Sequence, residues 1–82
     1  QNFCLFPNPA QNWVNVEILS GNTQTPHTVE LLTLYGGLVD RRDLAAGETI
    51  TGLSLAHLSA GIYLVRVSAP GKKGEVLKLV KE

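Results

Sequence analysis

The chain has 82 residues, of which 44% are hydrophobic and 17% charged, and its seven basic and seven acidic side chains give a formal net charge of +0. A chain of this length supports one core, so residues 1–82 are predicted to form a single domain. The composition excludes a membrane-spanning helix, which needs roughly 18 apolar residues in a row, and a bulk charge that would attract nucleic acid or acidic lipid.

The elements predicted along the chain are strands. Seven runs of alternating apolar residues are separated by turn-forming segments such as SGNTQTP, GG, AAGE and APGKKG. Short strands at this spacing predict an all-β fold, a seven-stranded antiparallel immunoglobulin-like Greek-key β-sandwich. The predicted strands are Phe3–Phe6, Trp13–Leu19, Thr28–Tyr35, Leu38–Leu44, Glu48–Leu53, Ile62–Ala69 and Val76–Lys81.

Between the first two strands, Pro7 and Pro9 flank Asn8. Each proline fixes its own φ and disfavours the helical conformation for the residue before it, so this segment predicts a rigid, extended elbow that aims the next strand. That strand begins at Trp13, which is interpreted as a core residue. The alternative for Trp13 is an exposed platform for a sugar ring.

The segment LSLAHLSAG is too short for a full helix and predicts a single helical turn across one end of the sandwich. Gly61 is expected to adopt the positive φ of a tight corner. Tyr63 then enters a strand with one hydroxyl to satisfy, as in the tyrosine corner of Greek-key sandwiches, where the hydroxyl bonds to backbone upstream. The strand Ile62–Ala69 is apolar on both faces of its first half and is predicted to be central.

The last predicted strand alternates, with Leu77 and Leu79 on the core face and Val76, Lys78 and Val80 on the other. Basic residues gather in this part of the chain. The simpler explanation is that lysines along an edge strand keep a sheet soluble and unpaired. The basic residues are Arg66, Lys72, Lys73, Lys78 and Lys81.

Residues suited to catalysis are sparse. Cys4 is the only cysteine, so an intramolecular disulfide is excluded, and it is interpreted as a small buried hydrophobe. Cys4, His27 and His57 are the only candidates for Cys–His catalysis, and none of them lies in a catalytic motif. No catalytic residue is therefore predicted.

Other site classes are equally weak. Asp40 and Asp43 flank Arg41 and Arg42, a pattern typical of solvated ion pairs. No cluster has the spacing of a zinc or calcium site, so neither a metal nor another cofactor is expected, and no small-molecule substrate. Nucleic-acid binding is disfavoured because the aromatic residues are interpreted as mostly core. These are Phe3, Phe6, Trp13, Tyr35 and Tyr63.

Four segments, FPNPA, LYGGLV, LSLAHLSAGIYLVRV and EVLKLVKE, occur in that order. As an ordered set they resemble the C-terminal sorting domain, type A, of the type IX (Por) secretion system. In this chain the family's motifs correspond to Phe6, Pro7, Asn8, Pro9 and Ala10 at the opening, Gly36, Leu38 and Val39 at the turn, Leu58, Gly61, Tyr63, Val65 and Arg66 at the corner, and Lys78, Leu79, Val80 and Lys81 at the closing strand.

One departure from the family's pattern lies at the turn. Thr33 stands where the family usually has an aspartate, and Gly37 where a basic residue is usual. A threonine hydroxyl bonds locally more weakly than a carboxylate does. The resemblance therefore predicts a turn that is looser or differently closed.

The resemblance implies a non-catalytic secretion signal that was excised from a larger cargo protein, in keeping with a chain that has no methionine. Its implied partners are an N-terminal cargo domain, the type IX translocon and a sortase-like cysteine peptidase. The peptidase would remove the domain, and the cargo would be anchored to lipopolysaccharide. The implied location is the outer membrane, cell surface or exterior, reached through the periplasm.

A recognition mechanism is suggested by Lys78 and Lys81 beside apolar residues. An exposed basic row on an unpaired strand would be bound by strand addition or by an acidic groove, and the same edge would allow a homodimer. The alternative function is a generic immunoglobulin-like or fibronectin-like module, serving as a spacer, an adhesin or a carbohydrate binder, because one fold hosts all of these.

Overall fold

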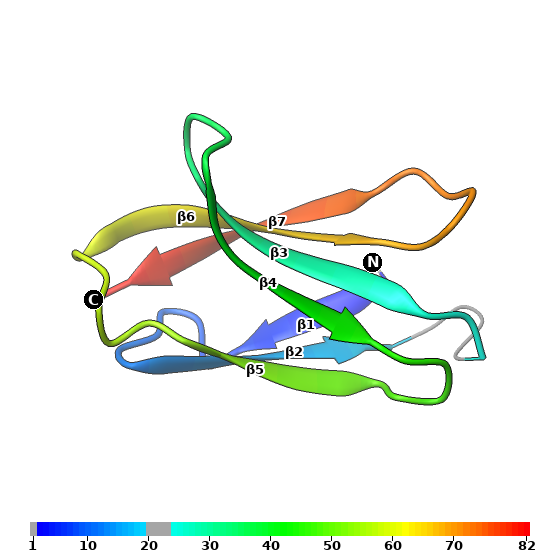
Figure 1. Cartoon of the computed structure of the whole chain (residues 1–82). Helices are drawn as coiled ribbons and strands as arrows, with labels where there is room; N and C mark the ends of the chain where they lie inside the picture. Colours follow the sequence, from blue (N-terminus) through cyan, green and yellow to red (C-terminus); the bar gives the residue numbers. More distant parts are fainter. Residues whose placement is uncertain (1, 20–23) are drawn as a thin grey trace.

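The computed structural model describes residues 2–19 and 24–82, which form two β-sheets packed face to face (Figure 1). One sheet has the strand order β1-β2-β5 and the other β4-β3-β6-β7, and all neighbouring strands are antiparallel. The strands are β1 (Phe3–Phe6), β2 (Trp13–Ile18), β3 (His27–Thr33), β4 (Leu38–Leu44), β5 (Ile50–Ser54), β6 (Gly61–Ser68) and β7 (Glu75–Lys81).

The connections follow a Greek key. β3 and β4 form a hairpin in the four-stranded sheet, β5 crosses to pair with β2, and β6 returns to lie beside β3. The predicted all-β sandwich is confirmed. β6 lies between β3 and β7, as its two apolar faces predicted.

The seven predicted runs become the seven strands, with several ends shifted. β3 stops at Thr33 because Leu34 and Tyr35 form the hairpin turn. β5 starts at Ile50 because Glu48 closes the preceding turn, where its N–H donates to the Ala45 carbonyl (2.9 Å). Of the predicted turn SGNTQTP, Ser20–Thr23 lie outside the described residues.

The core lies between the sheets and is built by alternation along the strands. In β7, Leu79 is fully buried and Leu77 packs against the core, whereas Val76 and Lys78 are exposed, as predicted. The buried core residues are Phe3, Ala10, Val14, Val16, Ile18, Val29, Leu31, Leu44, Leu53, Leu55, Val65, Val67 and Leu79.

Trp13 is not a core residue, so that prediction was wrong. Its side chain is 50% exposed, because it has the same strand parity as Asn15 and therefore lies on the outer face of the three-stranded sheet. The indole covers Gly52 on β5: a Cβ atom at Gly52 would lie 1.9 Å from its Cζ2 atom. Phe6 and Tyr35 are also exposed, so the aromatic residues are not mostly core.

The segment before β6 contains one hydrogen-bonded turn, in which the Leu58 N–H donates to the Leu55 carbonyl (3.0 Å). The absence of a full helix was predicted, but the predicted helical turn is a simple hydrogen-bonded turn here. Leu55 is fully buried and fixes the turn to the core. Across the part of the chain that the structure describes, no helix is long and apolar enough to cross a membrane.

Candidate functional site

The opening motif FPNPA lies against the closing strand. Asn8 reaches the outer edge of β7, where its Nδ2 donates to the Lys78 carbonyl (2.9 Å) and its Oδ1 accepts from the Val80 N–H (3.1 Å). The side-chain amide thus offers one donor and one acceptor, as a peptide group of a neighbouring strand would. Both proline peptide bonds that flank it, Phe6–Pro7 and Asn8–Pro9, are cis.

Ala10 continues this pairing through its backbone. Its N–H donates to the Val80 carbonyl (2.8 Å), and its carbonyl accepts from the Glu82 N–H (2.8 Å), which makes a parallel bridge between Ala10 and Lys81. Its methyl group is fully buried in the core. The elbow therefore does more than aim β2, because it also covers the edge of β7 from Lys78 to Glu82.

The expected exposed basic row on β7 is wrong in two respects. Lys78 is exposed, but Lys81 is only 9% exposed, and its Nζ donates to the Glu82 carbonyl (3.1 Å). The two lysines are three residues apart, and side chains alternate along a strand, so they lie on opposite faces. The backbone edge is also not open, because Asn8 and Ala10 pair with it.

The corner at the start of β6 is formed as predicted. Gly61 has φ +155°, a conformation that residues with a Cβ rarely adopt. Tyr63 donates its hydroxyl to the Ser59 carbonyl (2.8 Å), which is the upstream bond expected of a tyrosine corner. Leu58 is half-buried and packs against the core.

Arg66 lies on the outer face of β6, directly opposite Glu30 on β3. Its Nη2 lies 2.7 Å and its Nε 2.8 Å from Oε1 of Glu30. Both N–H groups thus engage one carboxylate oxygen. Arg66 is therefore already paired within the domain.

The β3–β4 turn is closed by Thr33. The Gly36 N–H donates to its carbonyl (3.0 Å), its own N–H donates to the Gly37 carbonyl (2.9 Å), and its Oγ1 accepts from the Gly37 N–H (3.0 Å). Gly36 has φ +88°, the left-handed conformation that a three-residue hairpin loop requires. The predicted local bond of the Thr33 hydroxyl is confirmed, and three hydrogen bonds close the turn.

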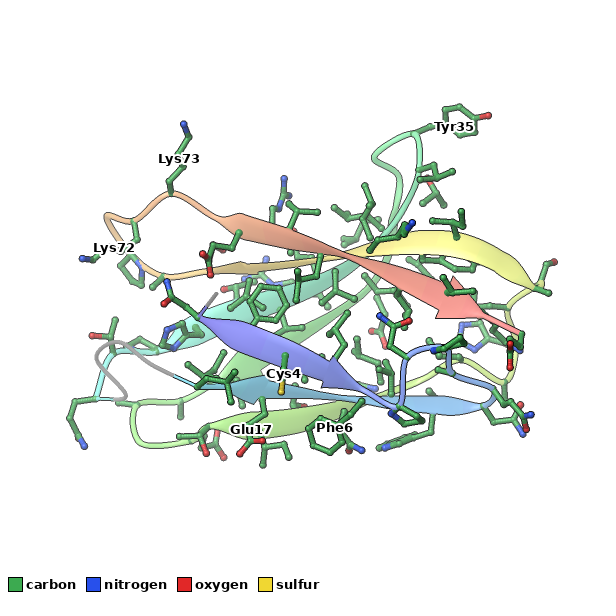
Figure 2. The ribbon with its side chains drawn as sticks, turned by 180° about the vertical axis from the view of Figure 1, so that it is seen from behind. Cys4, Phe6, Glu17, Tyr35, Lys72 and Lys73 are labelled. Carbon is green, nitrogen blue, oxygen red and sulfur yellow. The ribbon has the colours of Figure 1, made fainter. Side chains whose placement is uncertain are left out.

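The tip of this hairpin carries Tyr35, which is 98% exposed. The hairpin curves away from the three-stranded sheet, and Tyr35 stands at its end, far from Lys72 and Lys73 (Figures 1 and 2). Tyr35 was predicted to end a strand, whereas it lies in the turn and is exposed. A usable signal was present, because Leu31–Val39 surrounds the Gly-Gly turn without one charged residue, whereas hairpin turns are normally polar.

The candidates for catalysis are not assembled. Cys4 is half-buried, not buried as predicted, and pairs with Glu17 on the outer face of the three-stranded sheet (Figure 2). His27 belongs to the other sheet, and His57 is an exposed turn residue. Within residues 2–19 and 24–82, no group of three or more metal-ligating side chains occurs.

The charged residues of β4 form solvated pairs, as predicted. Arg41 lies 3.3 Å from Asp43, and Arg42 lies 3.5 Å from Asp40. Surface pairs of this kind contribute little to stability. They offer no pair of carboxylates for acid–base chemistry.

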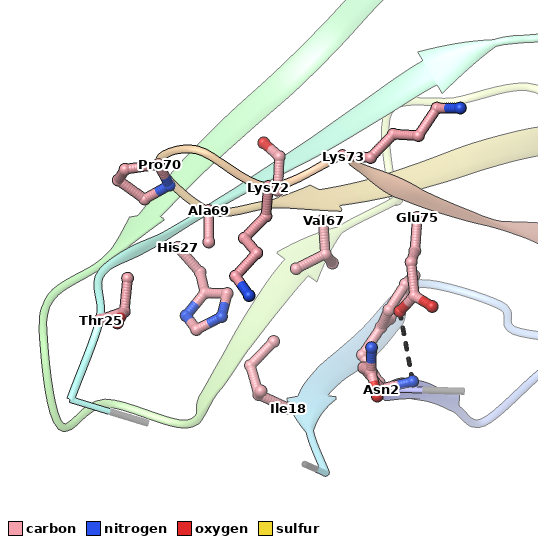
Figure 3. Close-up of a pocket in the computed structure, with 12 residues that line it drawn as sticks. Asn2, Ile18, Thr25, His27, Val67, Ala69, Pro70, Lys72, Lys73 and Glu75 are labelled. Atoms are coloured by element: carbon pink, nitrogen blue, oxygen red, sulfur yellow. Dashed lines mark hydrogen bonds between the residues drawn. The ribbon is translucent and has the colours of Figure 1, made fainter. Parts of the chain in front are cut away.

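A cavity of about 350 Å³ opens at the end of the sandwich near Lys72 (Figure 3). Its lining includes His27, Lys72, Lys73 and Glu75, and the Glu75 carboxylate accepts from the Asn2 N–H (3.2 Å). The Nδ1 atom of His27 is buried and has no hydrogen-bond partner among the described residues. Among the described residues, His27 therefore has no partner at Nδ1 that would orient its ring as a general base requires.

Comparison with known proteins identifies one family. The sequence model of the family described as secretion system C-terminal sorting domain matches residues 4–82. No curated protein matches the sequence.

Two solved structures show the same fold. A protein of the DUF3244 family from Bacteroides vulgatus, with an immunoglobulin-like β-sandwich, has a TM-score of 0.78 at 16% identity and covers 99% of this chain and 85% of its own. Dimeric latent PorU from Porphyromonas gingivalis has a TM-score of 0.74 at 22% identity. That match covers 96% of this chain and 9% of PorU.

Proposed function

The chain belongs to the family of secretion system C-terminal sorting domains, and we propose that it directs an attached cargo protein through the outer-membrane translocon of the type IX (Por) system. Sorting domains of this family are non-catalytic secretion signals, and the proteins that carry them are exported across the outer membrane. The β-sandwich is the secretion signal, and any enzymatic activity of the secreted protein resides in an N-terminal cargo domain.

The observation that carries this proposal is the link between the two ends of the family match. The match runs from residue 4 to residue 82, and Asn8, near its start, bonds to Lys78 and Val80, near its end. The opening and closing motifs therefore form one structure. A receptor that binds the closing strand β7 therefore binds it in a domain whose opening motif is already bonded to that strand.

The finer steps extend the same proposal. The domain is of type A, a sortase-like cysteine peptidase removes it from the cargo, and the cargo is then held at the cell surface by a lipopolysaccharide anchor. The start of β1 lies beside the start of β7, where the Asn2 N–H bonds to Glu75. A linker from the cargo would reach the domain there, away from the edge that Asn8 covers.

Recognition by strand addition is restricted by the cover on β7. Because Asn8 and Ala10 occupy the edge from Lys78 onward, a homodimer through this strand requires a second copy to displace the opening segment. We propose that such a dimer forms by exchange of segments. Sedimentation equilibrium over a wide concentration range tests this, and a monomer at every concentration contradicts it.

A reporter protein with a periplasmic signal peptide, fused to the N-terminus of the 82 residues, tests the proposed function. In a host with a working type IX translocon, the reporter is expected at the cell surface or in the medium. In an isogenic host without the translocon, it is expected in the periplasm. Retention in the periplasm of both hosts contradicts the proposal.

The half-exposed indole of Trp13 favours a second candidate, a carbohydrate-binding module. One face of the ring covers Gly52, which leaves the other for a sugar. Because Trp13 is the only tryptophan, its fluorescence reports directly on ligands at this position. Titration with oligosaccharides is expected to leave the emission unchanged, and saturable quenching would support the second candidate.

A further inference from the structure

The outer face of the four-stranded sheet carries an apolar surface that the fold does not use. We call it the outer apolar surface. On the sheet it consists of Leu38, Ile62, Leu64 and Val80, and at the tip of the β3–β4 hairpin it continues into Leu34 and Tyr35. Tyr35 is 98%, Leu38 59% and Ile62 42% exposed. Contiguous exposed apolar patches on soluble domains mark binding surfaces more often than chance.

Strand pairing makes this surface continuous. Leu32 on β3 pairs with Leu38 on β4 and with Leu64 on β6, while Ile62 on β6 pairs with Val80 on β7. Leu32 is itself buried, yet it does not belong to the core cluster between the sheets. A second, smaller apolar cluster therefore lies on the outside of the sheet.

The hairpin tip extends this cluster beyond the sheet. It curves away from the three-stranded sheet, and Tyr35 stands at its end (Figures 1 and 2). The three hydrogen bonds to Thr33 hold the turn in one conformation. A tyrosine has only two χ angles to fix when it binds, so its large ring costs little conformational entropy, and tyrosine is enriched at the energetic centres of interfaces.

The charges around the surface indicate the chemistry of its partner. Lys78 pairs with Leu64 across the strands and is exposed, and its ammonium makes no ion pair or hydrogen bond to a described residue. Arg66, two residues after Leu64 on β6, is not available in this way, because its guanidinium already pairs with Glu30. Lys78 therefore stands beside the outer apolar surface as an exposed cation with no ion-pair partner among the described residues.

We propose that the outer apolar surface is where the export machinery reads the folded domain, and that its partner is an apolar protein surface with a carboxylate opposite Lys78. The inference rests on the proposed function and names the partner chemistry that this function needs. A second copy is a poorer occupant, because a symmetric contact brings two Lys78 ammonium groups together without a carboxylate. A bilayer is also a poorer one, because anionic lipid is bound by clusters of basic residues.

The test uses the reporter fused to the full 82 residues, in hosts with and without the translocon. The variants are Y35S with L38S, and K78E. The matched controls are I50S, on the outer face of the other sheet, and K72E, at the opposite end of the domain. Circular dichroism melting of each purified variant checks that it folds.

Both surface variants are expected to lower the delivered reporter by about tenfold, the effect of losing one energetically dominant contact, while both controls deliver at the wild-type level. Wild-type delivery by K78E and by Y35S/L38S would overturn the surface assignment and leave the proposed function standing. Failure of the wild-type fusion to leave the periplasm would instead overturn the proposed function.

Two further measurements test whether a lipid bilayer or a second copy of the chain binds the outer apolar surface instead. Sedimentation of the purified domain with vesicles containing phosphatidylserine is expected to show no binding. Sedimentation equilibrium is expected to give the same mass for the wild type and Y35S/L38S. Vesicle binding or self-association that depends on Tyr35 and Leu38 would overturn the proposed partner chemistry. K78E keeps the test valid should the double variant fail to fold, because it leaves the Lys78 carbonyl bonded to Asn8 and changes only an exposed side chain.

Discussion

Asn8 illustrates how one side chain replaces part of a strand. Its amide pairs with the Lys78 carbonyl and the Val80 N–H, so the edge of β7 is satisfied without a further strand beside Asn8. The flanking prolines lack N–H groups and would be poor strand partners themselves. In the order Pro-Asn-Pro, the side-chain amide of Asn8 therefore makes the hydrogen bonds to β7 that the two proline nitrogens cannot donate.

The substitution N8A is expected to lower the free energy of unfolding by about 1–2 kcal/mol, because two hydrogen bonds are lost at a partly solvated edge. Urea unfolding followed by circular dichroism measures this. N12A is the control, since Asn12 is an exposed residue of the same connection, and it should change the free energy by less than about 0.5 kcal/mol. Equal effects of the two variants would contradict the role given to Asn8.

Thr33 gives a second residue-scale prediction. T33V keeps the β-branched shape but removes the Oγ1 acceptor of the Gly37 N–H, so it is expected to cost about 1 kcal/mol in unfolding free energy. T33D, which restores an acceptor there, should retain the wild-type stability. Thermal melts of both variants check this, and a T33V domain as stable as T33D would show that the bond contributes nothing.

The residues that the sequence predicted correctly are those with local partners. Gly61 and Tyr63 could be assigned because the corner needs a glycine conformation and an acceptor a few residues upstream, Ser59. The bonds of Asn8 could not, because they span 70 and 72 residues. The burial of Lys81 was missed for a simpler reason: alternation places it on the face opposite Lys78, and the two lysines were treated as one row.

The pairing of β2 with β5 includes a side-chain contact, in which the indole ring of Trp13 packs on the backbone of Gly52. The hydrophobic pattern predicted both strands, and its alternation places Trp13 on the face of Asn15 and Glu17. The core position was expected because tryptophan is a large apolar residue, and the alternation outweighs that preference. Gly52 was not noticed, although a glycine inside a strand signals the close approach of another group. The glycine at position 52 was therefore a signal in the sequence that another group packs on β5 there, and that group is the Trp13 ring.

The substitution G52A tests this contact. The new methyl group would overlap the indole of Trp13, so the ring must move into water, and we expect a red shift of its fluorescence with a loss of about 1–3 kcal/mol in stability. S54A, on the same strand, is the control for replacing a small residue of β5. An unchanged emission spectrum in G52A would show that the indole does not lie there in solution.

Strand ends were predicted less well than strand centres, for physical reasons visible at β3 and β5. Leu34 and Tyr35 have strand-like side chains but are needed for the turn that Gly36 permits. Glu48 continues an apparent strand, yet its carboxylate accepts the Ala45 N–H (2.7 Å) and closes a turn. In both cases local hydrogen bonds outweigh strand propensity.

For the whole molecule, β7 cannot be treated as a detachable tag. Leu79 belongs to the core, and the opening motif bonds to this strand. Removal of residues 75–82 is therefore expected to abolish cooperative unfolding, as seen by circular dichroism melting. A truncated domain that still melts cooperatively would contradict this dependence. A deletion that unfolds the domain cannot report on recognition, so point variants such as K78E are the better probes.

We infer that the folded sandwich, as opposed to a linear stretch of sequence, is the secretion signal. L53D places a charge at a fully buried position of β5 and is expected to unfold the domain, without changing any residue of the opening motif or of β7. I50D places the same charge on the exposed face of the same strand and should leave the fold intact.

The most direct measurement is the fraction of reporter at the surface of translocon-bearing cells for these two fusions. If the folded sandwich is the signal, the I50D fusion is delivered like the wild type, whereas the L53D fusion stays in the periplasm or is degraded there. Delivery of the unfolded L53D fusion at the wild-type level would contradict this inference.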